Sequence, residues 1–264
     1  MPDLDFYNDY YEQPQLWGRA LSTREEERIQ QTLRLIPEGC NSILEVGCGD
    51  GRIINRLASQ YKKACGLDSS QEALRHVKTE TIRGGVDRLP FSSQSFDLIL
   101  CCEVLEHLPF RVYLKALEEL QRVAAKYTII SVPYKQVLTR GMTTCLQCGC
   151  VFRPDRHLRS FDEKIMASLF KAFSLHAITP CQPSIRVYFP VIIPAAKLLN
   201  LTVSFPPNAL CPQCGYTTTD KKDTAPSNTG RKAGLRRSLR LLARRLMYTK
   251  KYPGWLIALY HREP

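Results

Sequence analysis

Short apolar runs alternate with amphipathic segments along the first half of the chain. Four runs have the length and composition of buried strands, at residues 42–46, 64–68, 96–102 and 127–132. Apolar residues recur at helical spacing between them, which predicts helices at residues 53–57, 70–77 and 112–123. Strands that alternate with helices in this way predict an α/β fold, a doubly wound and mostly parallel sheet with helices on both faces.

The N-terminal region has a different pattern. The first twenty residues are rich in aromatic side chains and are predicted to be irregular. A helix is expected next, because Ser22 and Glu25 have the spacing of a capping box. Ile29, Leu33 and Ile36 then lie on one face of that helix.

Two stretches interrupt the alternation in the second half, and we interpret them as insertions at residues 134–160 and 181–252 of one domain that spans residues 1–264. The regular pattern resumes between and after them. It predicts a helix at residues 161–173, a strand at 175–178 and a last strand at 255–260.

A glycine-rich loop follows the first predicted strand. Gly47, Gly49 and Gly51 occupy alternate positions, where they allow a sharp turn and the close approach of a ligand to backbone amides. The spacing differs from the Gly-x-Gly-x-x-Gly of dinucleotide-binding loops, and Glu45 stands two residues before the first glycine. An acid at this place favours a cationic ligand over a pyrophosphate.

Several motifs together resemble the class I S-adenosylmethionine-dependent methyltransferases, in particular small stand-alone enzymes that act on small molecules and glycans. The resemblance rests on residues 43–51, on Asp68 at the end of the second strand, and on residues 89–99 and 103–108. It implies a seven-stranded Rossmann-like sheet and S-adenosylmethionine as the cofactor. It also implies that residues 1–40 form a lid and the first helix.

The resemblance implies roles for individual residues. Asp68 would bind both ribose hydroxyls, the loop amides would contact the methionyl part, and Glu45 would orient its ammonium group directly or through water. Asp68 as a plain helix-capping acid is the alternative. Many relatives carry an Asp for adenine before the run at 89–91, whereas this chain has Gly84-Gly85-Val86-Asp87, so adenine recognition is expected from the Val86 amide. The cofactor-binding set is therefore Glu45, Gly47, Cys48, Gly49, Gly51, Asp68, Ser69, Val86, Asp87, Cys102 and Glu103.

Methyl transfer to oxygen or nitrogen needs an in-line approach, and a base helps if the acceptor is protonated. His107 and Glu106 are the catalytic candidates of the matched region. A structural histidine at a helix start is the alternative for His107. Tyr10, Tyr11 and Trp17 match the lid segment of such enzymes, or else they pack on the sheet.

Two Cys-x-x-Cys-Gly motifs lie in the two insertions. Cys145 and Cys148 form one, and Cys211 and Cys214 form the other, which together supply the four soft ligands of a structural zinc. Cys150 and His157 are reserve ligands, and two unrelated reduced pairs are the alternative. Because both insertions leave the carboxyl edge of the sheet, we expect one zinc to clamp them into a lid or wall of the acceptor pocket.

Charge changes the picture in one place. The chain has 37 Lys plus Arg, 25 Asp plus Glu and a net charge of +12, and nine of the basic residues lie between Arg231 and Lys251. That segment predicts a basic amphipathic helix, which packs on the sheet, binds an anionic lipid surface or lipid-linked substrate, or binds nucleic acid. An odd number of cysteines, 11, and an acidic, aromatic N-terminus predict a reduced, cytoplasmic protein, peripheral to the membrane if the helix binds lipid.

The expected function is therefore methyl transfer from S-adenosylmethionine to a small-molecule, sugar or lipid-linked acceptor, at oxygen. An RNA or protein methyltransferase that grips a macromolecule with the zinc lid and basic helix is the first alternative. A non-catalytic cofactor-binding protein is the second.

Overall fold

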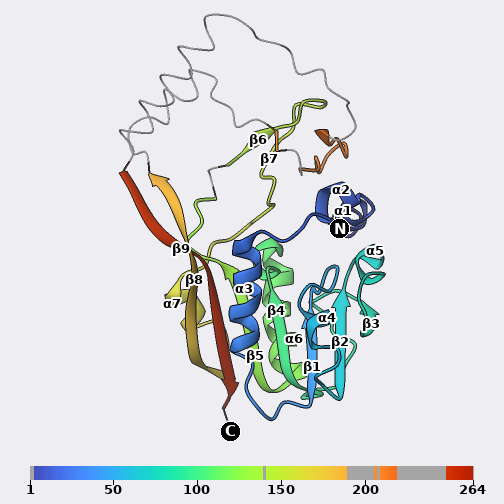
Figure 1. Cartoon of the computed structure of the whole chain (residues 1–264), viewed down its shortest axis with the longest axis vertical. Helices are drawn as coiled ribbons and strands as arrows, with labels where there is room; N and C mark the ends of the chain where they lie inside the picture. Colours follow the sequence, from blue (N-terminus) through green and yellow to red (C-terminus); the bar gives the residue numbers. More distant parts are fainter. Residues whose placement is uncertain (1–2, 139–140, 189–204, 207–208, 219–247, 264) are drawn as a thin grey trace, which may run out of the picture. The chain divides into compact units, whose positions relative to one another are not determined.

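The computed structural model describes residues 3–138, 141–188, 205–206, 209–218 and 248–263. It contains two compact units (Figure 1). Unit 1 comprises residues 1–140, 155–182 and 253–264, and unit 2 comprises residues 141–154 and 183–252. Both segments of unit 2 lie within the stretches that interrupt the strand–helix alternation.

A seven-stranded sheet forms the centre of unit 1. Its strands lie in the order β3-β2-β1-β4-β5-β9-β8. Strands β1 to β5 are parallel, and β9 runs antiparallel to β5. The predicted mostly parallel, seven-stranded α/β fold is confirmed. The bounds are β1 Ser42–Val46, β2 Lys63–Asp68, β3 Glu80–Arg83, β4 Phe96–Cys102, β5 Ala124–Pro133, β8 Phe173–Tyr188 and β9 Tyr248–Arg262.

Helices cover both faces of this sheet, because the central strands are apolar on both sides. Leu98 and Leu100 of β4 face the core that α3 and α4 cover with Ile29 and Ile54. The alternate residue Ile99 is equally buried and faces the side covered by α6 (Figure 1). The helices are α3 Thr23–Arg34, α4 Ile54–Leu57, α5 Gln71–Leu74, α6 Phe110–Val123 and α7 Glu163–Ala167, with a short 3-10 helix η1 at Leu105–His107.

The N-terminal residues are helical, so the prediction of an irregular segment was wrong. Helix α1 spans Asp3–Tyr11 and α2 spans Pro14–Trp17. Phe6 and Tyr10 are four residues apart, and the helix brings their ring centroids to 6.4 Å. Aromatic pairs at this spacing stabilise a helix. The Ser70 hydroxyl also donates to Asn8 Oδ1 (2.9 Å), which ties α1 to the sheet edge.

Other boundaries were partly right. The capping box at Ser22 and Glu25 is present, and Ser70 caps α5. The helix predicted at 161–173 is only α7, because β8 already begins at Phe173. Strand β3 was missed, since its residues are mostly exposed and form no apolar run. Residues 231–247 of the predicted basic helix lie outside the described residues, and its last residues, 248–251, belong to β9.

Unit 2 has a small core of its own. Strands β6 (Thr143–Thr144) and β7 (Val151–Phe152) pair antiparallel. Three aromatic side chains pack beside them, since the Phe205 ring lies 5.9 Å from Phe152 and 5.4 Å from Tyr216. Cys145 and Cys211 are buried in the same cluster.

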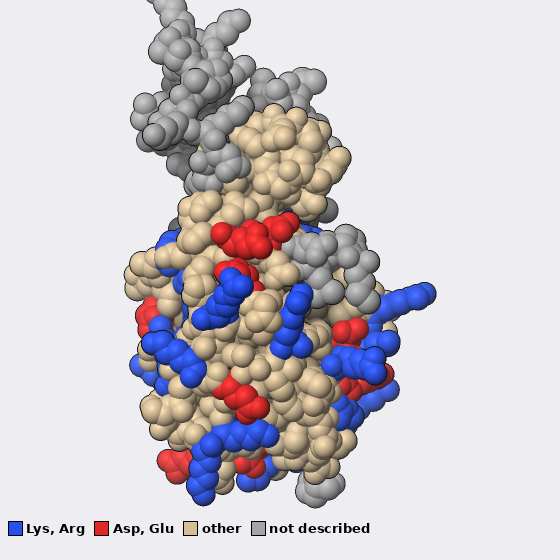
Figure 2. Space-filling model, turned by 90° about the vertical axis from the view of Figure 1, so that its right-hand side faces the viewer, with Lys and Arg blue, Asp and Glu red and all other residues tan. Residues whose placement is uncertain are grey.

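The surface shows no separation of charge on the face seen in Figure 2, where Lys and Arg side chains are interspersed with Asp and Glu. Among the described residues, no helix has the length and apolar character needed to cross a bilayer.

Candidate functional site

The chain reverses its direction of winding between β1 and β4. It proceeds from β1 to β2 and β3 on one side, and from β4 to β5 on the other. In doubly wound sheets the crevice at the carboxyl ends of two such strands is the place where ligands bind. The glycine loop follows β1 directly at this crevice.

The loop needs its glycines for steric reasons. Gly47, Gly49 and Gly51 have φ values of 72°, 53° and 80°, in the left-handed region that favours glycine. A Cβ on Gly47 would lie 2.3 Å from Val104 Cγ2, and one on Gly49 would lie 2.4 Å from the Tyr11 hydroxyl. The loop therefore forms a close cradle between the segment after β4 and helix α1.

Asp68 closes this cradle from the end of β2. Its Oδ2 accepts from the Gly49 amide (2.8 Å) and its Oδ1 from the Ser70 amide (2.9 Å). Burial raises the pKa of Asp68, and these backbone donors act in the opposite direction. Ser70 is the N-cap of α5, which leaves Asp68 to face the loop and disfavours the plain capping role.

Glu45 lies beneath the loop. It is almost fully buried, and its Oε2 accepts from the Ile54 amide (2.8 Å) at the start of α4. Burial raises the pKa of Glu45 to about 8. A cationic ligand group nearby would favour the ionised carboxylate.

Arg28 is a functional candidate that sequence reasoning missed. Its Nε and Nη1 atoms are buried and have no hydrogen-bond partner among the described residues. The charges of Glu103, Glu106 and Glu45 all act on its guanidinium. No sequence signal marks it, because it lies in a helix with many charged residues. A buried cation with free donors is suited to a carboxylate.

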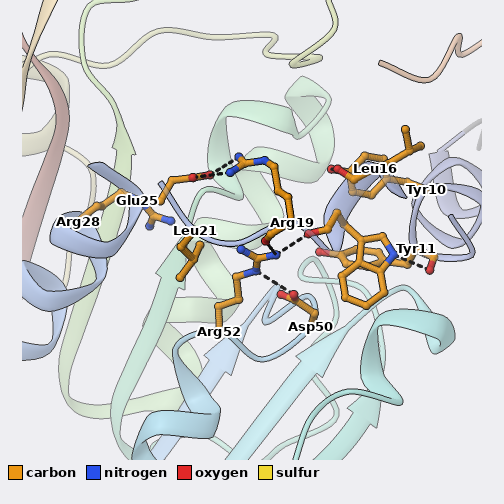
Figure 3. A pocket seen from close by; sticks show the side chains of 10 residues that line it. Tyr10, Tyr11, Leu16, Arg19, Leu21, Glu25, Arg28, Asp50 and Arg52 are labelled. Atoms are coloured by element: carbon orange, nitrogen blue, oxygen red, sulfur yellow. Dashed lines mark hydrogen bonds and ion pairs between the residues drawn. The ribbon is translucent and has the colours of Figure 1, made fainter. Parts of the chain in front are cut away.

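A cavity of about 180 Å³ opens beside Arg28 (Figure 3). Helices α1 to α3 and the glycine loop supply its walls. It is lined by Tyr10, Tyr11, Leu16, Trp17, Arg19, Leu21, Glu25, Arg28, Asp50 and Arg52.

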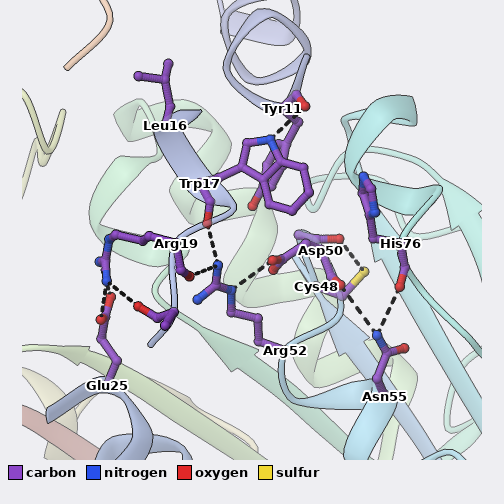
Figure 4. A network of polar contacts seen from close by, with 12 residues as sticks. Tyr11, Leu16, Trp17, Arg19, Glu25, Cys48, Asp50, Arg52, Asn55 and His76 are labelled. Atoms are coloured by element: carbon purple, nitrogen blue, oxygen red, sulfur yellow. Dashed lines mark hydrogen bonds and ion pairs between the residues drawn. The ribbon is translucent and has the colours of Figure 1, made fainter. Parts of the chain in front are cut away.

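Polar contacts tie the N-terminal helices to the glycine loop (Figure 4). Arg52 pairs with Asp50 (2.8 Å) and donates to the Trp17 carbonyl (2.5 Å). Trp17 Nε1 in turn donates to the Tyr11 carbonyl (2.8 Å). The predicted aromatic residues Tyr11 and Trp17 thus lie against the loop.

The remaining cofactor candidates fall into two groups. Ser69 adjoins Asp68, and the Gly84 amide donates to the Asp68 carbonyl (2.9 Å), which brings Val86 and Asp87 to the same edge. The thiols of Cys48 and Cys102 instead pack in the hydrophobic core, so only their backbone can face a ligand. Glu103 accepts from Trp255 Nε1 (2.7 Å) and from the Ser131 hydroxyl (3.3 Å).

The catalytic candidates form a buried cluster with a third residue. His107 Nε2 lies 3.9 Å and His157 Nε2 lies 4.0 Å from Glu106 Oε1. Burial raises the pKa of Glu106 well above its usual range, and burial next to His157 lowers the pKa of His107 to about 3. His157, predicted as a reserve zinc ligand, belongs to this cluster and lies in unit 1.

The four predicted cysteine ligands come together in unit 2 and could hold a metal ion. Cys145 Sγ lies 3.6 Å from Cys214 Sγ, and Cys148 Sγ lies 3.6 Å from Cys211 Sγ. A disulfide would need about 2.05 Å, whereas four sulfurs around Zn²⁺ at about 2.3 Å lie roughly 3.8 Å apart.

Each glycine that follows a motif allows its turn. Gly149 and Gly215 have φ values of 73° and 70°, and their amides donate to the carbonyls of Cys145 and Cys211. Burial raises the pKa of the Cys145 thiol, but nearby backbone amides outweigh it and bring the pKa to about 7. Cys150 is not part of the four-thiol group.

Comparison with known proteins agrees with this geometry. Residues 43–126 match a family described as a methyltransferase domain. A ubiquinone biosynthesis O-methyltransferase of Albidiferax ferrireducens is 27% identical over 93 residues, 31% of this chain and 37% of that protein. A Mycobacterium tuberculosis protein named a probable S-adenosylmethionine-dependent methyltransferase is 26% identical over 113 residues, 41% of this chain and 36% of its own. The matches span about a third of these curated relatives.

A solved structure extends the likeness to the whole fold. An S-adenosylmethionine-dependent methyltransferase of Thermotoga maritima aligns over 99% of both chains with a TM-score of 0.53 and 14% identity. Sheet order, glycine cradle and this likeness define the class I S-adenosylmethionine-dependent methyltransferase fold. The match to the methyltransferase-domain family is confined to residues 43–126 of this chain.

Proposed function

We propose that the protein transfers a methyl group from S-adenosylmethionine to the oxygen of a small-molecule, sugar or lipid-linked acceptor. The observation that carries the proposal is the glycine cradle closed by Asp68 at the crevice between β1 and β4. The partial match to a ubiquinone biosynthesis O-methyltransferase supports oxygen as the acceptor atom.

The residues at the crevice fit the parts of this cofactor. Asp68 offers two carboxylate oxygens to the ribose hydroxyls, and the orphaned donors of Arg28 suit the methionyl carboxylate. Glu45 is placed to orient the ammonium group, and the Val86 amide is the candidate for adenine. When bound, the cofactor supplies an electrophilic methyl carbon on a sulfonium.

Transfer requires the acceptor oxygen to approach in line with the bond that breaks, so positioning supplies much of the rate. The proton of a hydroxyl acceptor then needs a base. Glu106 and His107 are the predicted candidates for this base, and burial raises the pKa of Glu106 well above its usual range. His107, with a pKa near 3, stays neutral and orients the acceptor.

We further propose that one zinc ion is held by Cys145, Cys148, Cys211 and Cys214. Four thiols at near-tetrahedral spacing with turns closed by glycine support a structural site. The predicted wall of the acceptor pocket stays a prediction. If that prediction is right, Cys211→Ser should raise the KM for the acceptor. An unchanged KM would contradict the prediction.

The test is transfer of labelled methyl to fractionated cell extract, with Asp68→Asn as the control in which cofactor binding is expected to be weakened. Label in the lipid or small-molecule fraction supports the proposal. Label in RNA or protein, with binding to bulk RNA that falls steeply with salt, would favour a macromolecular acceptor. Absence of label from every fraction would favour a non-catalytic cofactor-binding protein.

A further inference from the structure

Glu106 presents a buried carboxyl group that nothing in the described part of the chain satisfies. The residue has no exposed surface, and neither Oε1 nor Oε2 has a hydrogen-bond partner there. An unpaired polar group in such a place costs free energy, and an unpaired charge costs more. Ring nitrogens of His107 and His157 lie 3.9 and 4.0 Å from its Oε1.

The two histidines come from distant segments that the backbone holds together. Glu106 and His107 lie in η1 after β4, and the Leu158 amide donates to the Glu106 carbonyl (2.7 Å). The imidazole rings lie 4.6 Å apart at an interplanar angle of 79°, so they converge on the carboxylate without stacking.

The hydrogen bond between His157 and Gln136 sets the tautomer of the imidazole. Its Nδ1 lies 2.5 Å from Gln136 Oε1, an acceptor that places the ring proton on Nδ1. Asp155 Oδ2 lies 3.7 Å from the same nitrogen. The lone pair of Nε2 then points toward Glu106. Histidines that bind a metal through one ring nitrogen typically donate a hydrogen bond to such an acceptor from the other.

We propose that Glu106, His107 and His157 form a site for one divalent transition-metal ion, of the class of Mn²⁺, Fe²⁺ or Zn²⁺. One ligand atom from each residue lies within 4.8 Å of the others, so shifts of about 1 Å reach the separation of roughly 3.4 Å that ligands around such an ion adopt. Two imidazoles and one carboxylate suit these ions better than Mg²⁺.

Three protein ligands leave coordination positions open. Val104, two residues before Glu106, packs on Gly47 of the glycine cradle, so the site adjoins the proposed cofactor crevice. On the proposed function, which this role presupposes, an open position would take the acceptor hydroxyl and make its proton easier to lose.

Binding of Mn²⁺ tests the site without cofactor or acceptor. Mn²⁺ prefers oxygen and nitrogen ligands to thiolates, so it reports this cluster rather than the four cysteines. The chelator-treated full-length protein is titrated with Mn²⁺, and the electron paramagnetic resonance signal of free Mn²⁺ is measured at each step. We expect one ion per chain and at least about tenfold weaker binding in Glu106→Gln and in His157→Ala.

Two further variants make the test specific. Gln136→Ala, which removes only the orienting acceptor, should weaken Mn²⁺ binding by about tenfold, whereas Cys211→Ser should leave it unchanged. Circular dichroism of each variant confirms the fold. The proposal is overturned if wild-type protein shows no saturable Mn²⁺ binding, or if His157→Ala binds as wild type does. Because the titration uses neither cofactor nor acceptor, Mn²⁺ binding can be measured even if the protein transfers no methyl group.

Discussion

Unit 1 and unit 2 differ in the size and composition of their cores. Unit 1 encloses its strands between helices and buries large side chains on both faces of the sheet, so its core is apolar and extensive. Unit 2 packs a few aromatic residues around buried cysteines. A core this small rarely suffices by itself, and metal ligation is a common supplement. We therefore expect burial to stabilise unit 1 and the proposed zinc ion to stabilise unit 2.

The largest expected effect comes from Cys211→Ser. Zinc binding contributes on the order of 10 kcal/mol to the folding of small zinc domains, so loss of one ligand should abolish stoichiometric zinc and unfold unit 2 while unit 1 keeps its thermal transition. Metal analysis and calorimetry measure both. Cys150→Ser is the matched control, since Cys150 lies beside the cluster without joining it. Full zinc retention in Cys211→Ser would contradict the idea that unit 2 depends on a four-thiol zinc site.

Asp68→Asn is expected to act on unit 1 alone. The substitution keeps the shape of the side chain and removes its charge, which should weaken binding of S-adenosylhomocysteine by about 10- to 100-fold. Zinc content should not change. Titration calorimetry gives the affinity, with Asp87→Asn expected to lose less. An equal loss in both variants would assign Asp87 a larger part in binding than we propose.

The buried Glu45 makes the stability of unit 1 depend on pH. Its pKa is about 8 in the folded protein and 4.5 in a free chain. Between these values the folded state keeps a proton that the unfolded state has released, so the free energy of unfolding falls as pH rises, by at most about 1.4 kcal/mol per unit. Urea unfolding across this range should show a flatter profile for Glu45→Gln. The exposed Glu38→Gln should follow the wild type, and a parallel profile for Glu45→Gln would contradict the assignment.

The smallest effect concerns the capping box of α3. The Ser22 hydroxyl accepts from the Glu25 amide, and Ser22→Ala should lower the stability of unit 1 by about 1 kcal/mol. The melting transition of unit 1 is the readout, with the exposed Ser59→Ala as control. A shift in unit 2 instead would show that the two units do not unfold separately.

Several features were predictable because their signal is local. The glycine spacing, the acid at the end of β2 and the two Cys-x-x-Cys-Gly motifs each occupy a few consecutive residues. Asp68 contacts the glycine loop, and the four thiols come together. The sequence did not identify Arg28 as a candidate, and it suggested His157 as a reserve zinc ligand. Arg28 looks like any charged residue of a surface helix, and His157 stands beside a cysteine motif yet packs with Glu106 and His107.

Local residue chemistry was enough to predict the central alternation of strands and helices, the glycine loop and the two thiol pairs, since turn geometry and apolar spacing act between near neighbours in the chain. The meeting of Glu106 and His107 with His157, and the burial of Arg28 among three carboxylates, depended on folding. Such groups are assembled by contacts between segments far apart in the chain. Burial raises the pKa of Glu106 and lowers that of His107, and no spacing of residues encodes burial.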